Sequence, residues 1–90
     1  MVTIVASGIQ FTTPNVTVPA NTAFTLELDN QDASVPHDVQ LKDAAGSQVV
    51  KTDTFPGVAK RSFAVPALAA GSYPFVCTIH ANMTGTLTAQ

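Results

Sequence analysis

Three features are scarce in this sequence, and each scarcity argues against a class of protein. Charged residues make up 11% of the chain and only four residues are Lys or Arg, whereas nucleic-acid binding needs a clustered basic surface. The single cysteine, Cys77, cannot form a disulfide within the chain. No apolar run approaches the roughly 20 residues that span a bilayer. The sequence therefore favours neither a nucleic-acid-binding, a disulfide-stabilised nor a membrane-spanning protein.

What the sequence does contain favours β-strands. Hydrophobic residues make up 46% of the 90 residues, which is enough for the core of one small domain over residues 1–90. Thr, Val and Ala are the commonest residues, and β-branched side chains favour strands. Gly, Pro, Asn and Asp interrupt the apolar runs about every 8–12 residues, which is typical of a sandwich or barrel. Because no long stretch has the helical period, we predict an all-β sandwich.

The alternation of apolar and polar residues predicts where the strands lie. Residues 16–18 precede a proline and are expected at a sheet edge, residues 66–71 are expected to form a turn or one helical turn, and Gly85 is expected where the chain passes close to another backbone. The longer strands are predicted at residues 2–6, 22–29, 35–41, 61–65, 72–78 and 84–89.

Side chains that can bind soft metal ions are concentrated in one short stretch. Cys77, His80 and Met83 lie within the sequence CTIHANM, and the only other such donors are His37 and Met1. Side chains alternate along a strand, so His37 shares the apolar face of its strand with Val39 and Leu41. By the same alternation Cys77 lies on the face of Tyr73 and Phe75. Both donors are therefore expected to point into the core.

Each of these donors has an ordinary explanation when taken alone, because His and Met can be core residues and Cys is among the most buried residue types. Taken together, two imidazoles, a thiolate and a weak thioether form the ligand set of a type 1 copper site for electron transfer. Two His and one Cys would also bind Zn²⁺. Four protein ligands leave no position for a substrate, and no Ser/His/Asp or paired-carboxylate arrangement is visible, so we expect no enzymatic activity.

Three segments resemble the cupredoxins, the small blue copper proteins that include plastocyanin and amicyanin. They read PHDVQL, GSYPFVCTIHANM and MTGTLT, and the short Cys-x-x-His-x-x-Met spacing is similar to that of amicyanin. The resemblance implies a Greek-key sandwich of about eight strands that holds one copper ion near one end. It also implies that His37, Cys77 and His80 are equatorial ligands and that Met83 is the axial ligand.

One position departs from the family pattern. The cupredoxin histidine is often followed by Asn, but here the next residue is Asp38. Alternation places Asp38 and Thr78 on the faces opposite His37 and Cys77, so we predict that the Asp38 carboxylate accepts a hydrogen bond from Thr78 and orients the ligands. Its negative charge is expected to favour Cu(II). Asp29 and Asp32 form either a partner-docking patch or, as we favour, a solvated loop.

The predicted function is one-electron transfer on copper, with the electron entering or leaving through the exposed edge of His80. Pro36 and Ala81 are expected to form an apolar patch that docks transient redox partners, as small redox interfaces do. The alternatives are copper trafficking or sensing, a sandwich without a metal role, and a domain cut from a larger redox protein.

The resemblance and copper chemistry imply a monomer in the periplasm or another extracytoplasmic space. The N-terminal sequence MVTIVASG lacks the basic segment and long apolar run of an export signal. We therefore expect Met1 to stand where an export signal or a larger protein has been removed.

Overall fold

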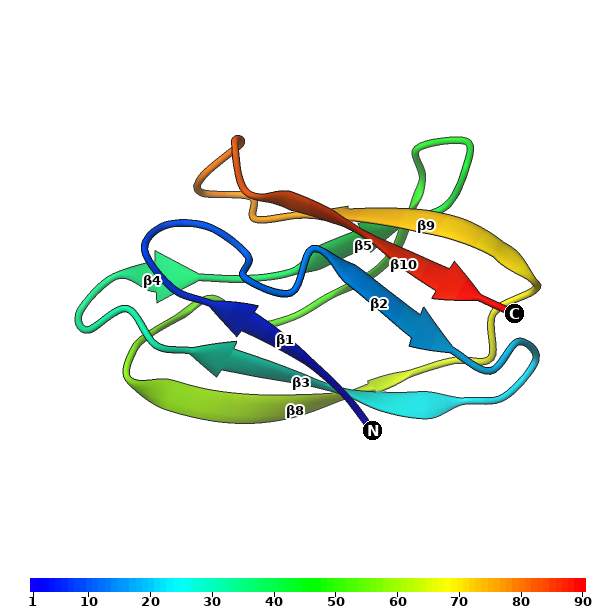
Figure 1. Ribbon diagram of the computed structural model, residues 1–90, viewed down its shortest axis with the longest axis horizontal. Helices are drawn as coiled ribbons and strands as arrows, with labels where there is room; N and C mark the ends of the chain where they lie inside the picture. Colours follow the sequence, from blue (N-terminus) through cyan, green and yellow to red (C-terminus); the bar gives the residue numbers. More distant parts are fainter.

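Ten strands and the turns between them make up the regular structure of residues 1–90 in the computed structural model (Figure 1). None of the chain is helical, so no helix could cross a membrane. The strands are β1 (Val2–Ala6), β2 (Asn15–Val18), β3 (Phe24–Asn30), β4 (Pro36–His37), β5 (Gln40–Lys42), β6 (Gln48–Lys51), β7 (Phe55–Pro56), β8 (Ala59–Val65), β9 (Gly71–Val76) and β10 (Thr84–Ala89).

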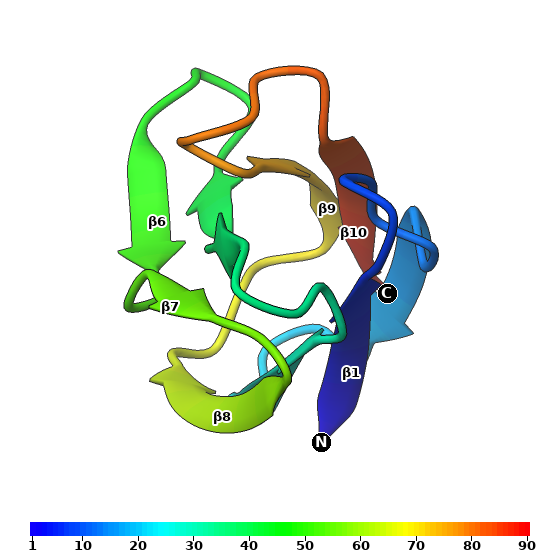
Figure 2. The ribbon, with the colours of Figure 1, turned by 90° about the vertical axis from the view of Figure 1, so that its left-hand side faces the viewer.

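Two sheets form the layers of the sandwich, and a third, two-stranded sheet is separate from both. One sheet has the order β1-β3-β8, the other has the order β2-β10-β9-β5-β6, and β4 pairs with β7 (Figures 1 and 2). The β1–β3 and β2–β10 pairs are parallel, and the other pairs are antiparallel. The all-β sandwich prediction is therefore confirmed, with ten strands where about eight were expected.

The core lies between the two sheets and is built by alternation. Leu26 and Leu28 of β3 are at most 1% exposed, whereas Thr25, the residue before Leu26 on the same strand, faces solvent. Cys77 and Met83 belong to this same apolar cluster. The other members are Ile4, Ala6, Phe11, Val18, Leu26, Leu28, Val39, Leu41, Phe55, Val65, Leu68, Phe75, Leu87 and Ala89.

The hairpin of β9 and β10 runs from one end of the molecule toward the other. Thr84 pairs with Val76, so residues 77–83 form the connecting loop at one end, which Figure 2 faces. Ala89 pairs with Gly71, so the C-terminus lies at the opposite end of the hairpin. The short β4–β7 ladder lies toward the same end as the connecting loop (Figure 1).

The structure corrects two details of the predicted strands. The strand expected at residues 35–41 is broken into β4 and β5, because β4 pairs with β7 whereas β5 pairs with β6 and β9. Residues 66–71 contain no helical turn. The close approach expected at Gly85 is present, since a Cβ atom there would overlap the Phe75 ring and lie 2.8 Å from the Pro14 carbonyl oxygen.

Candidate metal centre

The loop of residues 77–83 is closed by its own backbone. The Cys77 N–H donates to the Met83 carbonyl at 3.0 Å and continues the β9–β10 ladder by one pair, while the Met83 N–H donates to the His80 carbonyl at 2.9 Å. These two bonds fold the chain back so that Cys77, His80 and Met83 come from one compact turn. The short spacing of the CTIHANM stretch is what allows this closure.

Strand pairing brings the fourth residue, His37, to the same loop. In the β5–β9 pair Gln40 lies opposite Val76 and Leu41 opposite Phe75. Continued beyond the paired residues, this antiparallel register carries the chain before β5 alongside the chain after β9. His37, forty residues from Cys77 in sequence, therefore reaches the thiol from the neighbouring segment.

Three donor atoms converge at this end of the sandwich. The Cys77 Sγ lies 3.8 Å from His37 Nδ1 and 3.7 Å from His80 Nδ1, and the three donor atoms lie within 4.8 Å of one another. Metal bonds of about 2.3 Å to sulfur and about 2.0–2.1 Å to nitrogen, meeting at about 120°, would separate such donors by about 3.8 Å. The separations therefore fit a metal ion in a trigonal set.

Burial divides the donors into two groups. His37 and Cys77 are fully buried and Met83 is 1% exposed, whereas His80 is partly exposed. The His37 and His80 rings are tilted at 58° with centroids 5.0 Å apart. By its chemistry the set of two His, one Cys and one Met fits copper, and only one of its rings reaches the surface.

The contact expected between Asp38 and Thr78 is present. The Thr78 N–H and hydroxyl donate to the Asp38 carboxylate at 2.7 and 2.6 Å, the Thr54 hydroxyl donates at 2.8 Å, and the Lys51 ammonium lies 3.3 Å away. Burial raises the pKa of Asp38, but the hydrogen bonds from Thr78, Thr54 and Lys51 outweigh it and hold the pKa below the ordinary 3.8. Asp38 is thus a buried carboxylate that contacts four polar groups of three residues and ties the segments of His37 and Cys77 together.

Asp32 lies in the largely exposed loop after β3, but its side chain is bound to other residues rather than solvated, contrary to the expectation from sequence. Its Oδ2 lies 2.6 Å from His37 Nε2, and its carboxylate also accepts the N–H groups of Gly8 at 2.7 Å and Ile9 at 3.0 Å. The hydrogen bond from Ile9, followed by that from His37, lowers the pKa of Asp32 below 3.8. No periodicity in the sequence indicates this contact, because it depends on the path of two loops.

The two residues expected to form a docking patch are both exposed. Pro36 and Ala81 face solvent, in β4 and directly after His80. Ile79 is 45% exposed beside His80, and Ile9, whose N–H binds Asp32, is 44% exposed. The residues on either side of His80 in sequence, Ile79 and Ala81, are therefore exposed and apolar.

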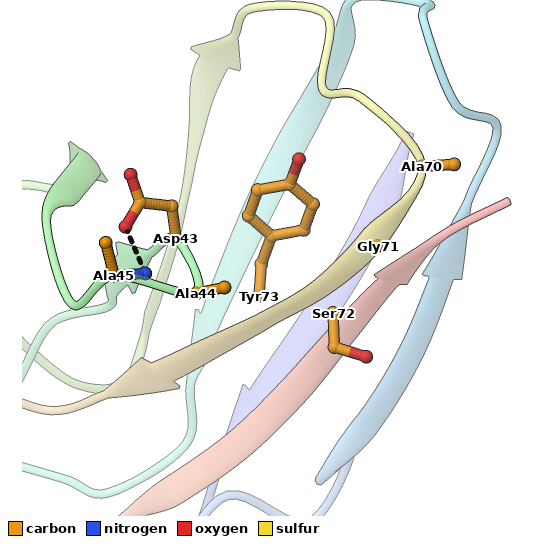
Figure 3. Close-up of a pocket in the computed structure, with 7 residues that line it drawn as sticks. All are labelled: Asp43, Ala44, Ala45, Ala70, Gly71, Ser72 and Tyr73. Carbon is orange, nitrogen blue, oxygen red and sulfur yellow. Dashed lines mark hydrogen bonds between the residues drawn. The ribbon is translucent and has the colours of Figure 1, made fainter.

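The largest cavity has no part in this cluster. A pocket of about 350 Å³ lies between the β5–β6 turn and the start of β9 (Figure 3), and it is lined by Asp43, Ala44, Ala45, Ala70, Gly71, Ser72 and Tyr73. The Asp43 carboxylate accepts the N–H groups of Ala45 and Ser47 within its own turn, and the Tyr73 hydroxyl donates to the Ala69 carbonyl. The Asp43 carboxylate and the Tyr73 hydroxyl of this pocket are thus occupied in local structure.

Comparison with known families agrees with this geometry. The sequence model of a family described as "Cupredoxin-like domain" matches residues 1–89. The chain belongs to the cupredoxin-like family. No curated protein sequence matches the chain significantly.

Solved cupredoxin structures are similar to this one over nearly the whole chain. Reduced auracyanin of Roseiflexus castenholzii is 17% identical with a TM-score of 0.86, covering 98% of this chain and 94% of its own. Auracyanin A of Chloroflexus aurantiacus, described as a "blue" copper protein, is 19% identical with a TM-score of 0.86 and coverages of 99% and 97%. Amicyanin of Paracoccus versutus is 24% identical with a TM-score of 0.74 and coverages of 99% and 80%. At these identities the similarity establishes the cupredoxin fold.

Proposed function

We propose that this protein carries single electrons on a mononuclear type 1 copper centre, with His37, Cys77 and His80 as equatorial ligands and Met83 as the axial ligand. The supporting observation is the pair of 3.7 and 3.8 Å separations between the Cys77 thiol and the two imidazole nitrogens. Bound copper supplies a one-electron Cu(I)/Cu(II) couple that none of these side chains has by itself.

The protein's part is to hold the donors still. A backbone hydrogen bond joins Cys77 to Met83. Asp38 connects the segment of His37 to that of Cys77 through its hydrogen bonds with Thr78. Buried side chains in a close-packed core also have little room to rearrange. A frame of this kind keeps the donor positions similar in both oxidation states, which favours fast electron exchange.

The electron's route follows from burial. His80 is the partly exposed donor, while His37, Cys77 and Met83 are buried. We therefore assign the entry and exit of the electron to the exposed edge of the His80 ring, with Pro36 and Ala81 in the surrounding docking surface. Small, transient interfaces suit redox partners that must dissociate quickly.

The proposal extends to the setting of the protein. We infer a monomeric carrier, or a carrier domain of a larger redox protein, that works outside the cytoplasm and has no enzymatic activity of its own. The cupredoxin-like family match and the donor set support it. Exchangeable, colourless copper binding would instead indicate trafficking or sensing.

Absorption spectroscopy tests the copper centre. Adding one equivalent of Cu(II) to the metal-free protein should produce an intense visible charge-transfer band, which reductant bleaches and oxidant restores. Cys77→Ser should abolish the band because the thiolate is its source. Zn²⁺-loaded protein is the matched control and should stay colourless. A wild-type protein that binds Cu(II) weakly and without colour would contradict the proposal.

A further inference from the structure

A second carboxylate, Asp32, touches the outer nitrogen of a buried donor ring. Its Oδ2 lies 2.6 Å from His37 Nε2, while Nδ1 of the same ring lies 3.8 Å from the Cys77 sulfur. A carboxylate can only accept here, so Nε2 carries the proton and the lone pair of Nδ1 is directed at the thiol. The His37 ring is fully buried, whereas the Asp32 side chain is 14% exposed.

Asp32 is held in place by the backbone of the loop after β1. Gly8 donates its N–H to Oδ1 at 2.7 Å and Ile9 donates its N–H to Oδ2 at 3.0 Å. Both residues have positive φ angles, 68° for Gly8 and 54° for Ile9, and this conformation turns two successive N–H groups toward one anion. The N–H of Asp32 itself donates to the Asn30 side chain at 3.0 Å. The carboxylate is therefore fixed against the ring.

The charges of the two carboxylates near His37 are balanced differently. Asp38 has the Lys51 ammonium 3.3 Å away, which offsets its negative charge. Asp32 has no lysine or arginine partner, and its one ion-pair contact is with the His37 ring. Asp38 also makes no hydrogen bond to a side chain of the metal-donor set, since its partners are Thr54, Thr78 and Lys51. Of the two, Asp32 is the one whose charge acts on the centre through a ligand.

We propose that Asp32 is a positioning residue of the metal centre, which fixes the His37 tautomer and stabilises Cu(II) relative to Cu(I) through that ring. The inference rests on the proposed function. A carboxylate on the outer nitrogen makes an imidazole a stronger donor, and a stronger donor with an uncompensated negative charge stabilises the more highly charged ion. The residue thereby lowers the reduction potential of the centre.

The alternative is that Asp32 merely secures the loop of Gly8 and Ile9. That role would affect folding stability but would leave the balance between Cu(II) and Cu(I) unchanged. The test must therefore compare the two oxidation states and not only the amount of copper bound.

Asp32→Asn, measured beside Glu27→Gln, separates these roles. Both substitutions remove one negative charge, but Glu27 contacts Thr3 and no metal donor. Redox titration and competition binding should show Asp32→Asn weakening Cu(II) binding about tenfold or more relative to Cu(I). Tenfold corresponds to a rise in reduction potential of about 59 mV for one electron. Glu27→Gln should change the ratio far less. Equal weakening of both oxidation states, or equal shifts in the two variants, would overturn the proposal.

Nitrogen-15 NMR of the wild-type imidazoles gives a second readout that does not require a variant to fold. In metal-free and Zn²⁺-loaded protein, His37 should carry its proton on Nε2, and that proton should exchange slowly with water. A proton on Nδ1 in the metal-free protein would overturn the proposal even if Asp32→Asn cannot be purified. A wild-type protein with this tautomer but without a blue copper band would instead refute the proposed function and leave the Asp32–His37 pair standing.

Discussion

At the scale of the residue, Asp38 combines full burial with a charge, which is stable only because its oxygens are satisfied. Two hydrogen bonds from Thr78, one from Thr54 and the ion pair with Lys51 surround the carboxylate. A buried polar group left without partners costs about 1–3 kcal/mol. The residue therefore contributes to stability and ties the segment of His37 to that of Cys77.

Asp38→Asn should lower the free energy of unfolding by about 1–3 kcal/mol at pH 7, since one amide oxygen cannot replace a carboxylate that accepts several donors. The pKa of Asp38 is lowered in the folded protein, so this contribution is fully present above the ordinary pKa of 3.8 and is lost as the pH falls through the lower pKa of the folded protein. Urea unfolding measured from pH 7 to pH 2 gives the free energy of unfolding of both proteins. The difference between Asp38→Asn and wild type should narrow only at acidic pH.

Asp53→Asn is the matched control for that series, because Asp53 is exposed and its side chain makes no hydrogen bond. Asp53→Asn should change the free energy of unfolding little at every pH. A difference in free energy of unfolding between wild type and Asp38→Asn that stays constant down to pH 2 would refute the assignment.

Copper binding gives a separate test of Asp38. Unchanged copper affinity and an unchanged blue spectrum in Asp38→Ala would show that Asp38 does not orient the ligands.

Much of the site was predictable at this scale, for a definite reason. The inward direction of His37 and Cys77 follows from alternation, which depends only on the local chain. The contact of Asp38 with Thr78 follows from the same rule once two strands are taken as neighbours. Asp32 could not be found in this way, because its position depends on hydrogen bonds between two irregular loops.

At the scale of the element, the β9–β10 hairpin places the thiol by close packing. Gly85 of β10 lies opposite Phe75 of β9, and the Phe75 ring occupies the space that a side chain at position 85 would need. Phe75 of β9 and Cys77, the residue directly after β9, are both buried and lie two residues apart in sequence. A shift of this aromatic ring would therefore displace the strand that carries the thiol.

Gly85→Ala should destabilise the protein by about 1–3 kcal/mol, since its Cβ would overlap the Phe75 ring and crowd the Pro14 carbonyl at 2.8 Å. Urea midpoints measure the change. Thr84→Ala, an exposed change on the same strand, should stay within about 0.5 kcal/mol of wild type. Equal midpoints for Gly85→Ala and wild type would show that the hairpin has room at this position.

The elements themselves were predicted unevenly. The strand at residues 84–89 is confirmed at both ends, because threonine alternates with Gly85, Leu87 and Ala89 along the whole segment. The segment at residues 35–41 also alternates, but β4 and β5 join different partners and the strand breaks at Asp38 and Val39. Pairing partners lie far away in sequence, so local pattern cannot reveal such a break.

At the scale of the whole molecule, donors from two distant segments make metal binding a stabilising link. His37 is in β4, and the other three donors lie between β9 and β10. An ion bound only by the folded chain adds about 4.1 kcal/mol when its free concentration is about 1,000 times the dissociation constant. A domain of this size gains about 4–8 °C in Tm per kcal/mol.

Adding Zn²⁺ to the metal-free protein should therefore raise Tm by several degrees or more in a scanning calorimeter, and a chelator should reverse the rise. Zn²⁺ is the better probe because it does not oxidise the thiol. Cys77→Ser should show a much smaller rise, since it loses the thiolate. Equal rises in the two proteins would mean that the ion binds elsewhere on the chain.

The position of the C-terminus has a practical consequence for attaching the protein to an electrode or to a second protein. Ala89 pairs with Gly71, and six residues of extended chain, about 20 Å, separate Gly71 from Cys77. A linker added after Gln90 would attach the domain to an electrode or a second protein by the end remote from the ligand loop. The partly exposed His80 would then face away from the support. Under the proposed function, an anchored molecule would transfer its electron to a diffusing acceptor rather than to the support.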